Sequence, residues 1–342
     1  MKVSESMKKI KVQVNPYLEF MNSLLLTSRY NEMTIPFIGY GLMVEDENEY
    51  TIAIKTFLKP YANDLIYTKI GELIPNGFTF SRPVELMLSL GDSENFSKQY
   101  ELSELCIQYC GERDTIDDLL KQLKAFWDKT RYLEFFESVK YIYDPFVKRV
   151  SESLSKYPFV DIIENEYGQS QNSYNYILSS LMKGNFGIYF HNQDTGKSDL
   201  FSVFSTDDFS LSPAVLFHEY SHPFINPLTD KYYDLVQRYI DSYEKLKHYK
   251  LPDFQSGYGD FKECINEHLV RAMSIHLLIK INQTELANKQ LNNDLYCGYK
   301  FITQILERYD YYDMNRDKYD TFEQFYPELL GAFDLRYLMP TE

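Results

Sequence analysis

The spacing of apolar residues predicts a series of helices over the first 155 residues. A short alternating stretch at residues 10–15 is typical of a strand, and Asn15-Pro16 is expected to begin the first helix. The predicted helices cover residues 17–28, two stretches between 45 and 73 separated near Pro60, 84–90, and a long region from Asp114 or Thr115 that is interrupted near Asp144-Pro145. No pattern in this region indicates chemistry.

The character of the sequence changes after Pro158. Four segments rich in aliphatic and aromatic residues are separated by Gly, Asn and Asp, at residues 158–164, 174–181, 186–190 and 200–205. We expect three or four of them to form a small mixed or antiparallel sheet. The last of these segments leads into the next predicted helix. This strand could border a cleft with an exposed edge, where an extended peptide could add as a further strand, or it could equally be fully paired.

Helical patterns return after residue 212 and continue to the end of the chain. Besides a helix that begins at Pro213, the predicted helices cover residues 229–249, 261–281, 294–308 and 321–333. The expected fold class is α+β, mainly helical with a small mixed or antiparallel sheet. We expect a helical N-terminal part over residues 1–155. A second part over residues 156–342 would hold the sheet and the later helices.

Composition restricts the partners of the protein. With 44% hydrophobic and 25% charged residues among 342, the chain is typical of a globular protein, and its net charge of −15 disfavours nucleic acid or an anionic membrane surface. No apolar run is long enough to span a membrane. The first fourteen residues lack the apolar segment of a signal peptide, so we expect a cytoplasmic protein, or a secreted one if a leader was removed. Of the four cysteines, Cys106 and Cys110 are expected to be buried thiols.

The motif with the clearest chemistry is His218-Glu219-Tyr220-Ser221-His222, an H-E-x-x-H. On a helix, residues four apart share a face, so both imidazoles can bind one zinc ion. Glu219 would then lie beside a zinc-activated water and could accept its proton. Such a motif also arises by chance in roughly one chain in a hundred of this composition. Ser212 and Pro213 favour a helix start, whereas Pro223 predicts a kink and Asn226-Pro227 an end.

A catalytic zinc site usually takes a third protein ligand. The candidates on the predicted helix at residues 261–281 are Glu263, Glu267, His268 and His276. Both glutamates share a narrow polar stripe with Arg271 and Ser274 on an otherwise apolar helix, which favours Glu267 and leaves Glu263 as the alternative. His268 and His276 lie in the apolar arc and are expected to be packing histidines. Arg271 follows Glu267 by four residues and is suited to orienting its carboxylate.

The H-E-x-x-H motif followed by Asn266-Glu267 resembles the gluzincins, a branch of the zincin metallopeptidases. The resemblance implies that His218, His222 and Glu267 bind Zn²⁺ and that Glu219 is the general base. Residue 271 departs from the family pattern, since it is Arg where the family has Asp. The longer strings HEYSHPFINPL and NEHLVRA, with NPYLEF near the N-terminus, also resemble an uncharacterised bacterial family of H-E-x-x-H proteins.

The sequence therefore predicts a zinc-dependent metallopeptidase that hydrolyses peptide or amide bonds, with a zincin-like catalytic part over residues 156–342. A peptide or protein is the expected partner. His191 and Tyr258 are of types that could polarise a substrate oxygen, without further support from the pattern. The alternative is a non-catalytic binding or scaffold protein with a structural or vestigial metal site. The pattern does not determine the oligomeric state.

Overall fold

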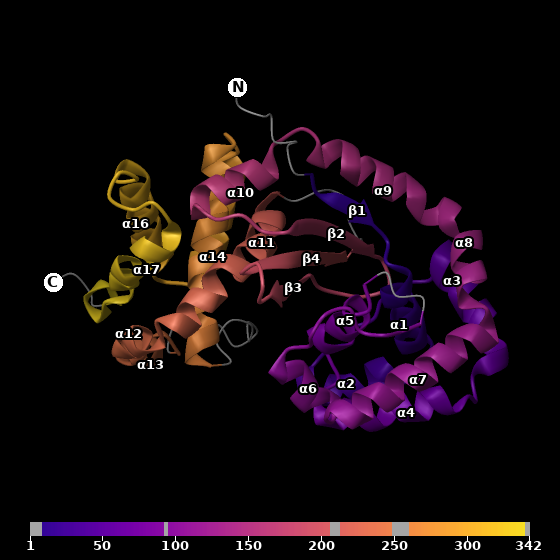
Figure 1. Ribbon diagram of the computed structural model, residues 1–342. Helices are drawn as coiled ribbons and strands as arrows, with labels where there is room; N and C mark the ends of the chain where they lie inside the picture. The colour runs from indigo at the N-terminus through magenta and orange to yellow at the C-terminus, as the bar shows by residue number, and fades with distance from the viewer. Residues whose placement is uncertain (1–8, 92–94, 206–212, 248–259, 339–342) are drawn as a thin grey trace. The chain divides into compact units, whose positions relative to one another are not determined.

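Figure 1 shows a computed structural model of the protein, which describes residues 9–91, 95–205, 213–247 and 260–338. Its internal contacts divide the chain into two compact units. The sheet unit contains Ile10–Ser155 and Ser173–Ser210, and the helical unit contains Lys156–Asn172 and Leu211–Glu342. One division between the units follows Ser155. The sheet, however, groups with the N-terminal helices and not with the helix that carries the H-E-x-x-H motif.

The sheet unit has nine α-helices and four strands within its described residues. The helices are α1 (Pro16–Thr27), α2 (Tyr30–Ile38), α3 (Glu49–Leu58), α4 (Leu65–Leu73), α5 (Ser81–Leu88), α6 (Glu104–Cys110), α7 (Arg113–Thr130), α8 (Tyr132–Ser138) and α9 (Lys140–Leu154). The strands are β1 (Lys11–Gln13), β2 (Ser173–Ser179), β3 (Phe186–Asn192) and β4 (Lys197–Ser205). Asn15 caps α1 as predicted, because its side chain accepts from the backbone N–H of Tyr17 and Leu18.

The four strands form one mixed sheet in the order β1-β2-β4-β3. β1 and β4 both run parallel to β2, whereas β3 and β4 form an antiparallel hairpin. The fold is therefore α+β and mainly helical with a small mixed sheet, as predicted. β4 is paired along both edges, so of the two alternatives the fully paired strand is correct and the free edge for peptide addition is wrong.

Two predictions for the middle of the chain are also wrong. Residues 158–164 do not form a strand but lie in α10 (Phe159–Tyr167), where Phe159, Ile163 and Tyr167 are buried at a spacing of one helical turn. The long helical region is interrupted at Arg131, which has a left-handed backbone, and at Val139, instead of near Pro145. Because Pro145 removes only one hydrogen bond of α9, the helix continues through it.

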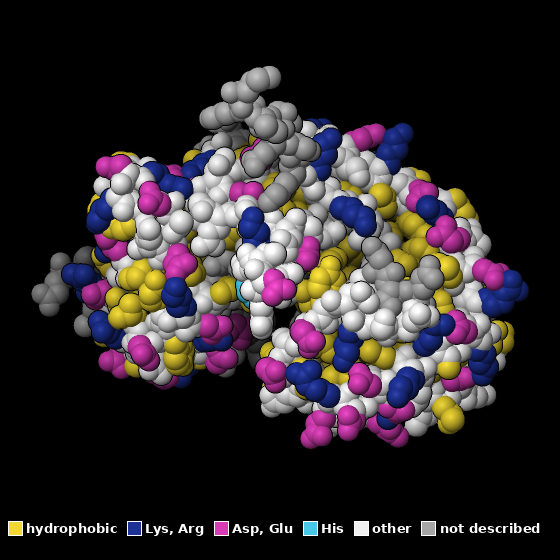
Figure 2. Space-filling view, in the orientation of Figure 1, with side chains coloured by type: hydrophobic (Ala, Val, Ile, Leu, Met, Phe, Trp, Pro, Cys, Tyr) yellow, Lys and Arg dark blue, Asp and Glu magenta, His cyan; other side chains and the backbone are white. Residues whose placement is uncertain are grey.

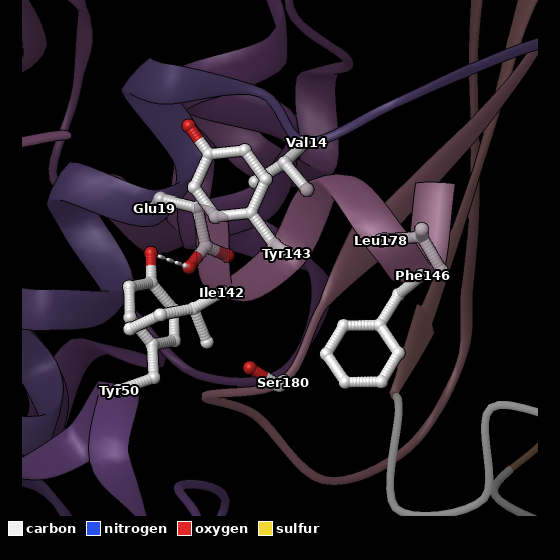
Figure 3. A pocket seen from close by; sticks show the side chains of 8 residues that line it. All are labelled: Val14, Glu19, Tyr50, Ile142, Tyr143, Phe146, Leu178 and Ser180. Atoms are coloured by element: carbon white, nitrogen blue, oxygen red, sulfur yellow. Dashed lines mark hydrogen bonds between the residues drawn. The ribbon is translucent and has the colours of Figure 1, made fainter. Parts of the chain in front are cut away.

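The core of the sheet unit is strongly aromatic. The indole of Trp127 and the phenol of Tyr132 pack edge-on against Phe20 of α1, at centroid distances of 5.2 and 4.9 Å. Next to them, Glu19 is buried beside a small cavity between α1, α3 and α9, and accepts a hydrogen bond of 2.8 Å from the hydroxyl of Tyr50 (Figure 3). Cys106 and Cys110 are buried free thiols, as predicted.

The helical unit consists of helices throughout its described residues. They are α10, α11 (Pro213–Lys231), α12 (Tyr233–Val236), α13 (Ile240–Leu246), α14 (Phe261–Lys280), α15 (Thr284–Tyr296), α16 (Ile302–Met314) and α17 (Phe322–Leu329). The helices predicted at 229–249 and 294–308 do not have these bounds. The first three residues of the former belong to α11, which extends to Lys231, and the latter is interrupted where α15 ends at Tyr296. None of the described helices is long and apolar enough to cross a membrane.

Candidate metal centre

The H-E-x-x-H motif lies in the first half of α11. The helix begins at Pro213 and continues through Pro223 and Pro227 to Lys231, so the predicted end at Asn226-Pro227 is wrong. Burial explains this continuity, because Phe217, Phe224 and Ile225 anchor the helix in the core on both sides of the first proline. The predicted N-cap, Ser212, lies outside the described residues.

The long helix α14 packs along α11 (Figure 1). The hydroxyl of Ser274 donates to the carbonyl of Ala214 at 2.6 Å, and the hydroxyl of Thr229 donates to the side chain of Asn266. Position 214 thus lies beside 274 and position 229 beside 266, which makes the two helices antiparallel. In this register, the middle of α14 lies opposite the two motif histidines.

This packing brings His218, His222 and Glu267 together, and their ligand atoms form a compact triangle. The two Nε2 atoms are 3.2 Å apart, and Glu267 Oε1 lies 3.9 Å from that of His218 and 3.6 Å from that of His222. A point equidistant from the three atoms is about 2.1 Å from each, within the range of roughly 2.0–2.2 Å for zinc bound to nitrogen or oxygen. Two imidazole nitrogens and one carboxylate oxygen are also a ligand set typical of zinc, so the residues present fit this ion.

The charge states of the group suit a cation. Burial lowers the pKa of His218 to about 3, although Glu267 acts in the opposite direction, so the imidazole is neutral near pH 7 and can bind a metal. For Glu267, burial alone would raise the pKa. Interactions with the imidazoles of His218 and His222 and with the guanidinium of Arg271 outweigh burial and lower the pKa, which keeps the carboxylate ionised.

Side chains around the triangle hold Glu267 and His222 in place. Glu267 Oε2, the oxygen turned away from the histidines, accepts from Arg271 Nε at 3.1 Å. Arg271 also donates to the fully buried carboxylate of Asp294 at 3.0 Å and stacks on the ring of Tyr299 at 4.2 Å. His222 Nδ1 lies 3.3 Å from Asn226 Oδ1 on the same helix. Such contacts orient metal ligands and fix the ring nitrogen that faces the ion.

The sequence pointed to Arg271 as an orienting group through its spacing from Glu267, and the structure agrees. It did not indicate Asp294, because a carboxylate in a separate helix, 23 residues further on, has no spacing relation to the motif. Asn226 is four residues after His222, a spacing at which side chains on a helix can contact each other. This spacing could have predicted the contact, but the helix was expected to end at Asn226-Pro227.

The remaining candidates lie apart from the triangle. Glu263 is exposed at the start of α14, where its backbone N–H donates to Asp260, and it is not part of the His218–His222–Glu267 group. His268 is a packing histidine as expected, since it is fully buried and its Nδ1 is 2.8 Å from the carbonyl of Cys264. His276 is also buried, but it lies among charged groups and not only in an apolar arc.

The other residues with an expected role are placed as follows. Glu219 lies on α11 next to His218 and is 8% exposed. His191 belongs to β3 of the sheet unit, where its Nδ1 is 3.4 Å from Ser198 Oγ. Tyr258 lies outside the described residues. The structure thus assembles the two histidines and Glu267 without assigning a role to His191.

The fold and the site define a helical protein with a His-His-Glu group suited to a metal ion. The chain belongs to the family described as Domain of unknown function (DUF4932), whose model matches residues 10–332 and so extends over both units. No curated protein and no solved structure matches the chain.

Proposed function

We propose that the protein is a zinc-dependent hydrolase that cleaves peptide or amide bonds. The observation that carries this proposal is the convergence of His218, His222 and Glu267 at distances that fit one zinc ion, with the adjacent carboxylate of Glu219 on the same helix. Zinc in such a site would activate a water molecule and polarise the substrate carbonyl. The resemblance of the motif to gluzincins supports the peptide class of substrate.

The residues of the chain would have separate tasks. His218 and His222 supply neutral nitrogen ligands from one helical face, and Glu267 supplies a negative ligand whose direction is fixed by Arg271. Glu219 accepts the proton of the attacking water on its carboxylate and passes it to the leaving amine. No helix is needed beyond α11 and α14 to assemble these four groups.

The test uses the full chain, stripped with a chelator, reloaded with zinc and assayed with a mixed library of quenched fluorogenic peptides. The wild type is expected to lose hydrolysis on chelation and to recover it with zinc. Glu219→Gln should keep the metal and lower the rate by on the order of 10²–10⁴. Hydrolysis that survives this change would remove Glu219 from the mechanism. Exposed Glu263→Gln is the matched control, since it changes a glutamate outside the triangle.

The same preparation separates the hydrolase from the binding or scaffold alternative. Zinc that is lost in a His218→Ala/His222→Ala variant, together with hydrolysis in the wild type, supports the enzyme. Zinc that is bound in the wild type without hydrolysis of any library member would support a structural ion and overturn the hydrolase.

A further inference from the structure

A second group of ionisable side chains lies further along α14, where α10 and α16 contribute to it. His276 Nε2 is 3.1 Å from Asp313 Oδ2 and 3.5 Å from Glu166 Oε1, and the three residues form a compact group of possible metal ligands. Lys280 binds the other oxygen of each carboxylate, directly at Glu166 and at 2.8 Å from Asp313 Oδ1. Within the described residues, this is the only other such group besides the His-His-Glu triangle.

Two buried atoms face each other at the centre of this group. Glu166 is 2% exposed and His276 is 4% exposed, and Glu166 Oε1 and His276 Nε2 make no hydrogen bond of good geometry, so their polar contacts are the ion pairs with each other and between His276 and Asp313. Buried carboxylate and imidazole groups normally have polar partners, because burial removes their hydration and leaves them nothing else to bind. Both atoms face the same point, 3.5 Å from each other and beside Asp313.

We propose that Glu166, His276 and Asp313 bind a second divalent transition-metal ion, such as zinc, which joins α10, α14 and α16. One nitrogen and two carboxylate oxygens form a ligand set suited to zinc or manganese. The two known separations, 3.1 and 3.5 Å, are close to the roughly 3.4 Å between ligands of tetrahedral zinc. Its role would be structural, since it links three helices.

This site is separate from the His-His-Glu triangle. His276 follows Glu267 by nine residues on the same helix, which corresponds to about 13 Å along the axis and to the opposite face. The two sites can therefore be emptied independently by substitution. The second site does not depend on the proposed hydrolase.

The surrounding charges balance a divalent ion. Asp310 Oδ1 lies 3.7 Å from His276 Nδ1 and adds a third negative charge near the ring. The three carboxylates of Glu166, Asp310 and Asp313 carry three negative charges. Burial lowers the pKa of His276, but Asp313 and Glu166 outweigh it and raise the pKa to about 9, so a divalent ion would displace the imidazolium proton and, together with Lys280, neutralise the three carboxylates. Arg316 donates to the backbone carbonyl of Glu166 at 2.9 Å and fixes the end of α10.

The experiment counts zinc on the full chain after chelation and reloading, by calorimetry and by elemental analysis. We expect about two zinc ions per chain in the wild type and about one in His218→Ala/His222→Ala. His276→Gln should also lose one equivalent, and Asp313→Asn should weaken the same site at least about tenfold. Lys280→Gln should strengthen it, because the ammonium no longer competes for the carboxylates.

His268→Gln is the matched control, because His268 is an equally buried histidine of α14 outside both groups, and it should keep both ions. Circular dichroism of each variant verifies folding. The proposal is overturned if the wild type binds one ion that His218→Ala/His222→Ala abolishes, or if His276→Gln and Asp313→Asn keep both ions. If the His-His-Glu triangle does not bind zinc and the second site does, the wild type would hold one ion, and only His276→Gln or Asp313→Asn would remove it.

Discussion

The two carboxylate oxygens of Glu267 have different partners. One oxygen faces the imidazoles of the motif, and the other accepts from Arg271, which is held in turn by Asp294. Gln290 completes the series, because its amide lies 2.9 Å from both oxygens of Asp294. Arg271 contacts Glu267, so at the proposed metal site it would position the carboxylate of that glutamate.

Asp294→Asn tests this arrangement. The change removes a negative charge near the proposed cation and releases Arg271, and both effects are expected to lower zinc affinity at the triangle by about tenfold. The affinity is measured by competition with a chromophoric zinc chelator. Exposed Asp234→Asn, elsewhere in the helical unit, is the control. Unchanged zinc affinity in Asp294→Asn would show that Arg271 does not act through Glu267.

Glu19 makes the stability of the sheet unit depend on pH. Burial raises the pKa of Glu19 to about 7, although the hydrogen bond from Tyr50 acts in the opposite direction (Figure 3). Because the folded state binds this proton more tightly than the unfolded state, its stabilising contribution is complete below about pH 4.5. It is lost as pH rises to about 7, and the loss amounts to about 3 kcal/mol.

Glu19→Gln should therefore be more stable than the wild type at pH 8, and the two should converge toward pH 5. Urea unfolding of both proteins across this pH range measures the effect. The control is Glu72→Gln on the exposed face of α4, which should show the wild-type dependence. A wild type whose stability does not decrease between pH 5 and 7 would contradict the assignment of Glu19 as a protonated buried carboxyl.

Helices and strands could be predicted where burial follows a simple period. α1, α14 and the strands β2, β3 and β4 agree with the pattern, because each has one strongly apolar period and clear end signals. The prediction of a strand at α10 was wrong, because the apolar spacing of a short run such as PFVDIIE is compatible with a strand and with a helix. Tertiary packing decides between the two. Prolines led to a wrong prediction of a helix interruption in α9 and of a helix end in α11. Both helices continue through their prolines because buried neighbours on both sides keep them continuous.

Gly168 lies at the end of α10, close to the backbone of Asp320. Its φ is +62°, and an added Cβ would lie 2.6 Å from the backbone oxygen of Asp320. Gly168→Ala is therefore expected to lower the free energy of unfolding by more than the roughly 1–2 kcal/mol of a left-handed backbone alone. Gly196→Ala is the matched control, because Gly196 has a φ of +65° but nothing within 4 Å of a Cβ. Equal losses in urea unfolding would contradict the close contact.

The chain as a whole combines two compact units, and the matched family region, residues 10–332, extends over both. The sheet unit interrupts the helical unit in sequence, since α10 precedes β2 while α11 follows β4. Acidic and basic side chains are interspersed over the face shown in Figure 2, despite the net charge of −15. The division explains why a boundary near residue 155 could be predicted while the membership of the sheet could not.

Zinc binding should protect the backbone amides of one unit from hydrogen exchange. An ion that binds only the folded state stabilises the part that it closes, so hydrogen exchange in α11 and α14 should slow when the stripped protein is reloaded. The helices α1 and α7 of the sheet unit should change much less. Exchange measured by mass spectrometry with and without zinc tests this, and His218→Ala/His222→Ala should remove the effect at α11. Equal slowing in both units would contradict metal sites confined to the helical unit.

The sequence by itself determined the fold class, most helices and the identity of the candidate ligands. These depend on local properties, namely the spacing of apolar residues, helix caps and two histidines one turn apart. Tertiary structure alone decided that Glu267 meets the histidines, that Asp294 supports Arg271 and that His276 joins Glu166 and Asp313. Contacts between residues far apart in the chain depend on how helices pack, and a single sequence has no local signal for that packing.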